Sequence, residues 1–230
     1  MKILAIDTAT EGCSASLLID DQLTSQLQVQ PRKHAELILP MVETLLAESE
    51  LALSQLDCLA FGRGPGAFTG VRIAAGVTQG IAYGADLPVV PVSTLQALAQ
   101  RTWVETGHSK VLTAFDARME EVYWAGYELA ENGFMQQSLA EQVVKPEQAA
   151  LPGNLQEQSW VGAGSGWQTY EQVLIEKTGL SQSMTFASMI TRADEIAQLA
   201  AVDFKLGKFV SADKALPVYL RNSVAWKKAV

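Results

Sequence analysis

This chain of 230 residues has few histidines, few cysteines and a deficit of basic charge. It contains 2 histidines, 2 cysteines, and 17 lysine and arginine residues against 25 aspartate and glutamate residues, for a formal net charge of -8. Two cysteines are too few for a disulfide framework and fit a reducing compartment. The acidic balance disfavours a stand-alone nucleic-acid binder, which needs a basic surface to contact phosphates.

Long uninterrupted apolar runs are also missing, although 48% of the residues are hydrophobic. The charge-free residues 73–85 are interrupted by glycines and are shorter than the roughly 18 to 20 apolar residues that a membrane span needs. The apolar content excludes a disordered chain. The first residues, MKILAID, enter a strand pattern without the apolar core of a secretory signal. We therefore expect a cytoplasmic globular protein without membrane contact.

Hydrophobic patterning predicts an α/β protein with two related lobes. Residues 1–107 indicate the order β-β-β-α-β-α-β-α. The segment Lys110–Asp116 (KVLTAFD) then echoes Lys2–Asp7 (KILAID) with one residue inserted, and the order of elements restarts. We therefore expect an N-terminal lobe over residues 1–107 and a smaller α/β lobe over residues 108–230.

Several local predictions concern the ends of helices. Ser93 is expected to cap the helix that follows it, and Thr191 to cap the last helix of the second lobe. Pro40 should either kink the helix predicted over residues 32–49 or mark its first turn. Pro146 is expected near the start of a further helix.

The first strand ends in Asp7 and is followed by the turn Asp7-Thr8-Ala9-Thr10. This arrangement resembles the actin, sugar-kinase and chaperone-ATPase superfamily, in which the aspartate organises a magnesium ion and a turn glycine lets backbone amides approach phosphates. Here Ala9 stands where glycine is common, and the matching turn at Asp116 contains no glycine. Asp7, Thr8 and Thr10 are candidates for cofactor binding, and a structural role at the strand end is the alternative.

Two glycine-rich segments are further candidates for anion binding. Gly162 and Gly164, between a short strand and a helix, could admit a phosphate, although a tight turn explains them equally well. The segment GRGPGAFTGVR, residues 62–72, predicts a fixed and unusual loop that could hold an anion with the help of Arg63 or Arg72.

The helix after that loop carries three glycines on one face, at a cost of about 1 kcal/mol each relative to alanine. They are spaced four residues apart: Gly76, Gly80 and Gly84. The cost predicts close approach of another helix, and the spacing leaves open whether that helix belongs to this chain or to a partner.

The sequence contains none of three familiar catalytic motifs: the zinc-protease motif, a reactive cysteine or the serine-hydrolase motif. Position 38, four after His34, is isoleucine, so the two-histidine helical metal motif of zinc proteases is absent from the sequence. Cys13 and Cys58 lie in predicted strands without basic neighbours and are expected to be buried structural thiols. No serine has the G-x-S-x-G context of a hydrolase.

Four segments together resemble the bacterial TsaB (YeaZ) family of tRNA threonylcarbamoyladenosine biosynthesis. They are MKILAIDTATEGCSASL, GRGPGAFTGVRI, FDARMEEVYW and PVYLRNSVAWKK. The resemblance implies a two-lobe actin-like, ribonuclease H-like fold with a reduced second lobe. It also implies a degenerate paralogue of the catalytic subunit TsaD, whose H-x-x-x-H metal motif would fall here on His34 and Ile38.

The resemblance further implies the partners of this chain. They are a TsaD-like catalytic subunit and a TsaE-like ATPase, with a homodimer when these are absent, and tRNA is contacted mainly through the complex. ATP and metal are expected on the partner subunits, and no cofactor or metal on this one. The implied interface lies on two helices of the N-terminal lobe: His34, Leu37, Ile38, Met41, Val42, Leu45, Ile73, Gly76, Val77 and Gly80.

Our interpretation is a non-catalytic subunit that activates the transferase acting on the adenosine at position 37 of tRNA. Two alternatives stay open, an ATP-dependent phosphotransferase of the same fold and a glycoprotease-like peptidase. Lys227 and Lys228 belong to a basic C-terminal tail that we expect either to be solvated or to lie near RNA.

Overall fold

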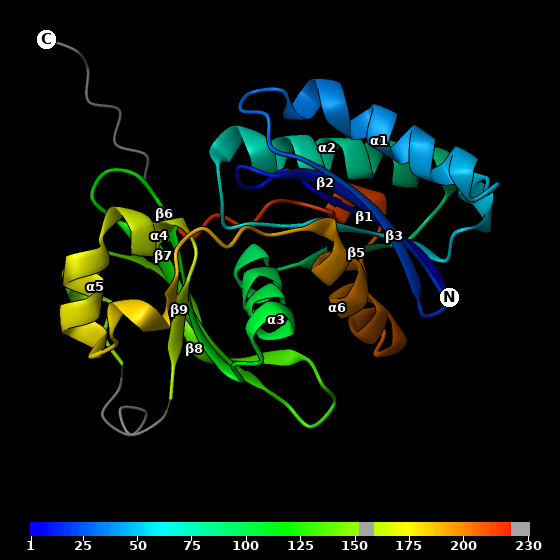
Figure 1. Cartoon of the computed structure of the whole chain (residues 1–230). Coiled ribbons are helices and arrows are strands. Elements are labelled where there is room, and N and C mark those ends of the chain that lie inside the picture. Colours follow the sequence, from blue (N-terminus) through cyan, green and yellow to red (C-terminus); the bar gives the residue numbers. More distant parts are fainter. Residues whose placement is uncertain (152–158, 222–230) are drawn as a thin grey trace, which may run out of the picture.

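The computed structural model describes residues 1–151 and 159–221, which form two five-stranded sheets covered by helices (Figure 1). Lys227 and Lys228 of the predicted basic tail lie outside the described residues. The strands of the first sheet are β1 (Lys2–Asp7), β2 (Cys13–Ile19), β3 (Gln22–Gln28), β4 (Cys58–Gly62) and β5 (Val89–Val92). Those of the second are β6 (Lys110–Asp116), β7 (Val122–Leu129), β8 (Met135–Val144), β9 (Val161–Ala163) and β10 (Thr185–Phe186).

The two sheets have the same topology. The spatial order is β3-β2-β1-β4-β5 in the first and β8-β7-β6-β9-β10 in the second. In both, the first three strands of this order pair antiparallel, whereas the fourth strand pairs parallel with the third and with the fifth. The echo between Lys2–Asp7 and Lys110–Asp116 is thereby explained, because these segments are the central strands β1 and β6. The predicted α/β fold with two related sheets is confirmed.

Helices cover both faces of the first sheet, because alternate residues of a strand point to opposite sides. The helices are α1 (His34–Glu48), α2 (Phe68–Ala85), α3 (Thr94–Thr106), α4 (Ser165–Thr169), α5 (Glu171–Thr178) and α6 (Ala193–Lys205). Leu4 and Ile6 of β1 face α1 and α2, whereas Ile3 and Ala5 of the same strand pack with Ile196 of α6. The first sheet is thus enclosed on both sides (Figure 1).

The second sheet is covered by α3 on one face and by α4 and α5 on the other. Leu95 and Leu98 of α3 share a core with Val111 of β6, and Trp167 of α4 shares the opposite core with Leu112. Helix α3, which precedes residue 107, therefore packs on the second sheet, while α6 returns from the end of the chain to the first. This exchange of helices ties the sheets together, and the boundary near residue 107 stays a prediction.

The helix ends test the local predictions. Ser93 caps α3 as predicted, its Oγ accepting a hydrogen bond of 3.2 Å from the amide of Gln96. The prediction for Thr191 is wrong, since Arg192 is the cap residue of α6 and has no side-chain cap bond. Pro40 lies in the interior of α1 rather than in its first turn.

The prediction of a helix that starts near Pro146 is also wrong. Only a single 3-10 turn, Pro146–Gln148, forms there. The chain then leaves the helical path, and Ala149 and Leu151 are buried in the core beside α5. Among the described residues, no helix is both long and apolar enough to cross a membrane.

Candidate functional site

Asp7 lies fully buried at the end of β1, in the position that the sequence marks as a candidate for cofactor binding. Its Oδ2 accepts a hydrogen bond of 2.5 Å from Oγ1 of Thr191, and its Oδ1 accepts one of 3.0 Å from the amide of Ala9. Burial raises the pKa of Asp7 above its ordinary value, and the bond from Thr191 opposes that rise. Both oxygens of the carboxylate therefore have hydrogen-bond donors within the protein.

The neighbouring threonines are engaged in the same way. Thr8 donates a hydrogen bond of 2.7 Å to the carbonyl of Gly70 in α2, and its side chain is buried. The hydroxyls of Thr10 and Thr191 lie 2.9 Å apart. The ring of His34, predicted as a partner contact, lies with Nε2 3.0 Å from the carbonyl oxygen of Thr10. The structure thus joins the Asp7 turn to the first residue of α1.

The glycine-rich loop closes over this turn. A Cβ atom at Gly66 would lie 2.3 Å from the carbonyl oxygen of Ala9, and one at Gly70 would lie 2.0 Å from that of Thr8. The amide of Ala67 also donates a hydrogen bond of 2.8 Å to Ala9. Glycine is required here because the loop backbone contacts the turn backbone directly. The loop therefore packs directly on the backbone of Thr8 and Ala9, the two residues that follow Asp7.

The two arginines of the loop contact other parts of the chain. The guanidinium of Arg72 lies 3.3 Å from the ring centroid of Phe68, and its Nε donates a hydrogen bond of 2.9 Å to the hydroxyl of Tyr219. Arg63 lies 3.3 Å from the carboxylate of Glu141 in β8. Both arginines named as possible anion ligands therefore have partners within the chain.

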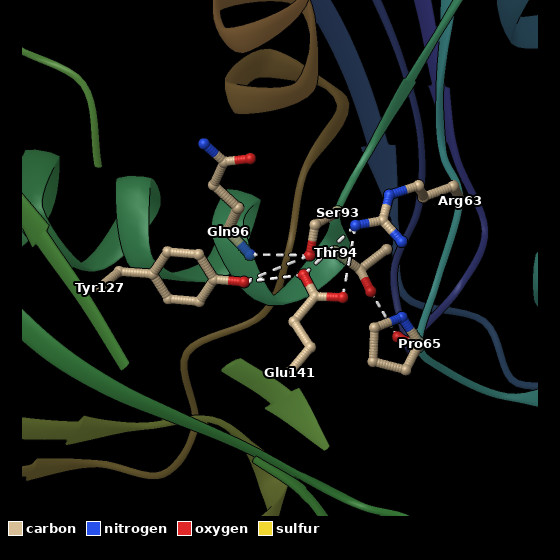
Figure 2. A network of polar contacts seen from close by, with 7 residues as sticks. All are labelled: Arg63, Pro65, Ser93, Thr94, Gln96, Tyr127 and Glu141. Atoms are coloured by element: carbon tan, nitrogen blue, oxygen red, sulfur yellow. Dashed lines mark hydrogen bonds and ion pairs between the residues drawn. The ribbon is translucent and has the colours of Figure 1, made fainter. Parts of the chain in front are cut away.

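The Arg63 contact belongs to a polar network that joins the two sheets (Figure 2). Arg63 and Ser93 follow β4 and β5, whereas Tyr127 and Glu141 lie on β7 and β8. The hydroxyl of Tyr127 donates a hydrogen bond of 2.8 Å to Glu141 and lies 3.4 Å from Oγ of Ser93. Burial, aided by the charge of Glu141, raises the pKa of Tyr127 well above its ordinary value. The phenol therefore keeps its proton and acts as a donor.

Thr191, Tyr127 and Glu141 were not among the residues that the sequence singled out for this region. Thr191 is 184 residues from Asp7, and Glu141 is 78 from Arg63. No spacing along the chain links such pairs, because the two sheets bring them together only after folding.

The matching turn of the second lobe is held by the chain's own C-terminal segment. The side chain of Arg221 contacts the carboxylate of Glu121 and donates hydrogen bonds of 3.2 and 3.3 Å to the carbonyls of Ala117 and Arg118. Arg118 in turn bonds the carboxylate of Asp116 through its amide, at 2.8 Å, and its guanidinium, at 2.9 Å. Asp116 thus closes its own turn.

Gly162 and Gly164 have a structural reason to be glycine. A Cβ atom at Gly162 would lie 2.3 Å from the indole of Trp167, and one at Gly164 would lie 2.5 Å from the carbonyl oxygen of Ala114. Gly164 also has a φ of 102°, which favours glycine. Gly162 thus lets Trp167 of α4 pack directly on β9, and Gly164 forms the tight turn between β9 and α4, against Ala114 of β6.

Four residues of the predicted partner interface lie in this chain's own core. Ile38, Met41, Val42 and Leu45 of α1 face the first sheet and are at most 4% exposed. A helix on a sheet must bury one apolar stripe, and the pattern alone does not say which residues form it. This part of the prediction is corrected: the surface left for a partner on α1 includes Leu37, which is half-buried, and Leu39, which is 46% exposed.

The predicted residues of α2 do reach the surface. Gly76 and Gly80 are exposed, and Ile73 and Val77 beside them are half-buried. A Cβ atom at Gly76, Gly80 or Gly84 would meet nothing within 4 Å. The three glycines predict that another helix packs closely against them. No helix in the described part of this chain does so. We call the outer side of α2 with the adjoining side of α1 the α1–α2 face: Leu37, Ile73, Gly76, Val77, Gly80 and Tyr83.

Metal and thiol chemistry receive no support from the described residues. Residues 1–151 and 159–221 contain no group of three or more histidine, cysteine, aspartate or glutamate side chains placed to hold a metal ion. Cys13 and Cys58 are free and fully buried, as predicted. Burial raises the pKa of Cys13 to about 11 and that of Cys58 to about 12, so both thiols stay protonated near neutral pH.

Comparison with known proteins places this geometry in a family. The family model described as TsaD, tRNA N6-adenosine threonylcarbamoyltransferase, matches residues 22–228. The tRNA threonylcarbamoyladenosine biosynthesis protein TsaB of Escherichia coli K12 is 44% identical over 235 residues, covering 99% of this chain and 98% of its own. The Haemophilus influenzae TsaB is 40% identical over 235 residues, with 99% and 97% covered.

Solved structures give the same result. The structure of YeaZ from Pseudomonas aeruginosa superposes with a TM-score of 0.88 at 45% identity, covering 95% of this chain and 99% of that one. A second structure from that organism, described as an uncharacterized protein with similarity to peptidase YEAZ, gives a TM-score of 0.89 at 45% identity, covering 96% and 99%. This chain therefore belongs to the TsaB (YeaZ) family.

Proposed function

We propose that this chain acts in tRNA threonylcarbamoyladenosine biosynthesis as a non-catalytic subunit that binds and activates a TsaD-like transferase. The transferase would modify the adenosine at position 37 of tRNA. The full-length match to TsaB proteins supports the pathway. The role of a binding subunit is supported by one observation: on the α1–α2 face, no described part of the chain packs against the glycines.

The α1–α2 face has the properties of a helix-packing surface. Exposed glycines let a second helix approach closely, and the half-buried Ile73 and Val77 beside them supply apolar contacts. Interior glycines cost stability in an isolated helix, so their presence is explained when a partner covers them. Because the catalytic paralogue is built on the same fold, its corresponding helices offer a matching surface.

The environment of Asp7 supports a role without phosphoryl chemistry. The carboxylate is buried and bonded to Thr191, and Gly66 and Gly70 bring backbone against the turn that follows it. A nucleotide phosphate would compete with these contacts for the same space. We assign ATP and metal chemistry to the partner subunits, a TsaD-like transferase and a TsaE-like ATPase.

Activation would operate by preorganisation. A partner that docks on a rigid face selects one arrangement of the transferase and so raises the population that is competent for transfer. The contacts between the two sheets, through α3, α6 and the network around Glu141, keep this chain in one shape for that purpose. In the cytoplasm, where tRNA is modified, the transferase would make most of the contact with RNA, because this chain is acidic.

The direct test is complex formation followed by mass measurement. The purified chain is mixed with its catalytic paralogue, and the mass of the species is compared with those of the separate proteins. A heterodimer is expected, and replacement of the homodimer by the heterodimer is expected where the chain alone self-associates. If the two proteins stay apart at concentrations well above those in the cell, the proposal is wrong.

The phosphotransferase alternative is tested on the isolated chain. Magnesium-dependent binding of ATP, lost in an Asp7→Asn variant, would favour it. The peptidase alternative would require that cleavage of a candidate substrate depend on His34, whose ring contacts the backbone of Thr10.

A further inference from the structure

A groove of about 820 Å³ lies at the C-terminal end of α2, next to the α1–α2 face. One wall is the last turn of α2 with Tyr83 and Asp86, and the other is the segment after α6 with Phe209 and Asp213. The segment is fixed to the edge of β5 by two hydrogen bonds between Val89 and Val210, of 2.9 and 2.8 Å. Backbone hydrogen bonds therefore hold this wall of the groove in place against the first sheet.

Its walls combine exposed aromatic rings with acidic groups. Tyr83 is 85% exposed and Phe209 is 47% exposed, and the ring of Phe209 is held by that of Phe204 at a centroid distance of 5.3 Å. Among the residues that line the groove, Asp86 and Asp213 are charged and none is basic. Within the described residues, neither carboxylate forms an ion pair, although a hydrogen bond with the Ser211 side chain and the charge of the adjacent Lys214 lower the pKa of Asp213.

The end of α2 adds to the negative potential. The C-terminus of a helix carries a partial negative charge, which basic side chains in the last turn commonly offset. The last turn of α2 has no basic residue, and Asp86 is itself the C-cap, in the left-handed conformation. A cation entering the groove would meet two carboxylates, the helix terminus and the face of an exposed ring, all of which favour it.

The groove is continuous with the α1–α2 face. Tyr83 follows Gly80 by one helical turn and lies beside Gly84, so it stands on the exposed side of α2 that carries the glycines. A partner helix that packs along the glycines would end over the groove. An occupant attached to the same partner could then reach both surfaces at once.

We infer that the groove lined by Tyr83, Asp86, Phe209 and Asp213 receives a lysine or arginine side chain of the catalytic paralogue docked on the α1–α2 face. The inference rests on the proposed function and adds a charged contact to an otherwise apolar interface. Such a contact orients the two subunits and speeds their association more than it adds affinity. It also makes complex formation sensitive to salt.

The test compares the affinity of the catalytic paralogue for three forms of the full chain by titration calorimetry. They are the wild type, the double variant Asp86→Asn with Asp213→Asn, and the single variant Asp21→Asn. Asparagine suits position 86 because it tolerates the left-handed conformation. Asp21 is an exposed acidic residue in the turn between β2 and β3, remote in sequence from the groove, and serves as the charge control.

The double variant should bind about three- to tenfold more weakly than wild type at low ionic strength. That difference should shrink to less than about twofold in ~1 M salt, where the screening length is roughly 3 Å. Asp21→Asn should bind like wild type. Equal affinities of the double variant and Asp21→Asn at low salt would overturn the groove assignment and leave the proposed function intact.

Two other outcomes also decide the matter. If the wild type does not bind the paralogue, both the proposed function and this inference fail. If the double variant binds the paralogue normally but loses self-association in sedimentation, the occupant is a second copy of this chain, and the assignment to the paralogue is wrong.

Discussion

Thr191 donates a 2.5 Å hydrogen bond to Asp7, although 184 residues separate the two. The bond joins the segment before the last helix, α6, to the end of the first strand, β1. It places a hydroxyl of the protein on the carboxylate that the sequence marks as a possible magnesium organiser. The carboxylate of Asp7 therefore has a structural contact within the protein, which supports the proposed role of this chain as a binding subunit.

Removing the hydroxyl at position 191 should destabilise the fold. Thr191→Val keeps the shape of the side chain but leaves Oδ2 of buried Asp7 without this donor, and such a loss costs about 1 to 3 kcal/mol. Thr191→Ser keeps the hydroxyl and should lose about 1 kcal/mol or less. The free energies of unfolding in urea at neutral pH give the comparison. Equal losses in the two variants would show that the hydrogen bond contributes nothing.

Two glycines of α2 should respond in opposite ways to the same substitution. In Gly70→Ala the new Cβ would lie 2.0 Å from the carbonyl oxygen of Thr8, so the loop must move, at a cost of about 3 kcal/mol or more. In Gly76→Ala the Cβ meets nothing, and the better helix propensity should add about 0.5 to 1 kcal/mol. Thermal unfolding of both variants measures this, and a stable Gly70→Ala protein would contradict the packing of the loop on the turn.

The network between the sheets should show energetic coupling between Arg63 and Glu141. Their side chains are 25% and 9% exposed, so the pair is partly shielded from water. A double-mutant cycle with Arg63→Gln and Glu141→Gln should give a coupling energy of about 1 kcal/mol or more in urea denaturation. Strictly additive effects would mean that the two residues do not stabilise each other across the sheets.

Glu195 should make stability depend on pH between 4.5 and 7. Burial raises the pKa of this carboxyl from 4.5 to about 7, opposed by Arg101, whose Nη1 lies 3.2 Å from Oε1, and reinforced by Asp194. Between these values the folded chain binds more protons at this residue than the unfolded chain does. Its contribution to stability is therefore full below pH 4.5 and is lost as the pH rises through 7.

The variant Glu195→Gln removes this dependence. Relative to wild type, it should gain up to about 3 kcal/mol as the pH rises from 4.5 to 7, from the size of the shift. Urea denaturation at several pH values measures the difference between the two proteins. A difference that stays constant across this range would contradict the assignment.

The exposed glycines should matter for association and not for folding. Gly80→Leu adds a side chain where a Cβ meets nothing in this chain, so the isolated protein should unfold at the same temperature or higher. Binding of the catalytic paralogue should weaken more than about tenfold, because the larger side chain blocks close approach of a helix. Gly80→Ala should have a smaller effect. Undiminished affinity in Gly80→Leu would move the interface away from α2.

The order of elements could be predicted from the sequence because it depends on local patterns. Apolar runs and turn residues locate the central strands, and the echo between Lys2–Asp7 and Lys110–Asp116 identifies them as equivalent. Ser93 caps a helix through contacts within a few residues, which is why that prediction is confirmed. The spacing of Gly76 and Gly80 likewise predicts the close approach of another helix, but it leaves open whether that helix belongs to this chain or to a partner.

Contacts between distant segments could not be predicted. Thr191 has the residue type of a helix cap, but its hydroxyl bonds to Asp7, which a local pattern does not reveal. The apolar residues of α1 were visible as a stripe, yet only the position of the sheet decides that Ile38 and Leu45 face inward. Glu141 carries no signal of its own, because its partner Arg63 comes from the other sheet.

The central claim is that this chain enables the transferase without doing chemistry itself. The measurement that tests it most directly is the formation of threonylcarbamoyladenosine in unmodified tRNA by the purified catalytic paralogue and its ATPase, with and without this chain. We predict that the modification forms rapidly with the chain present and stays near background without it. Equal rates of modification in the two reactions would contradict the account.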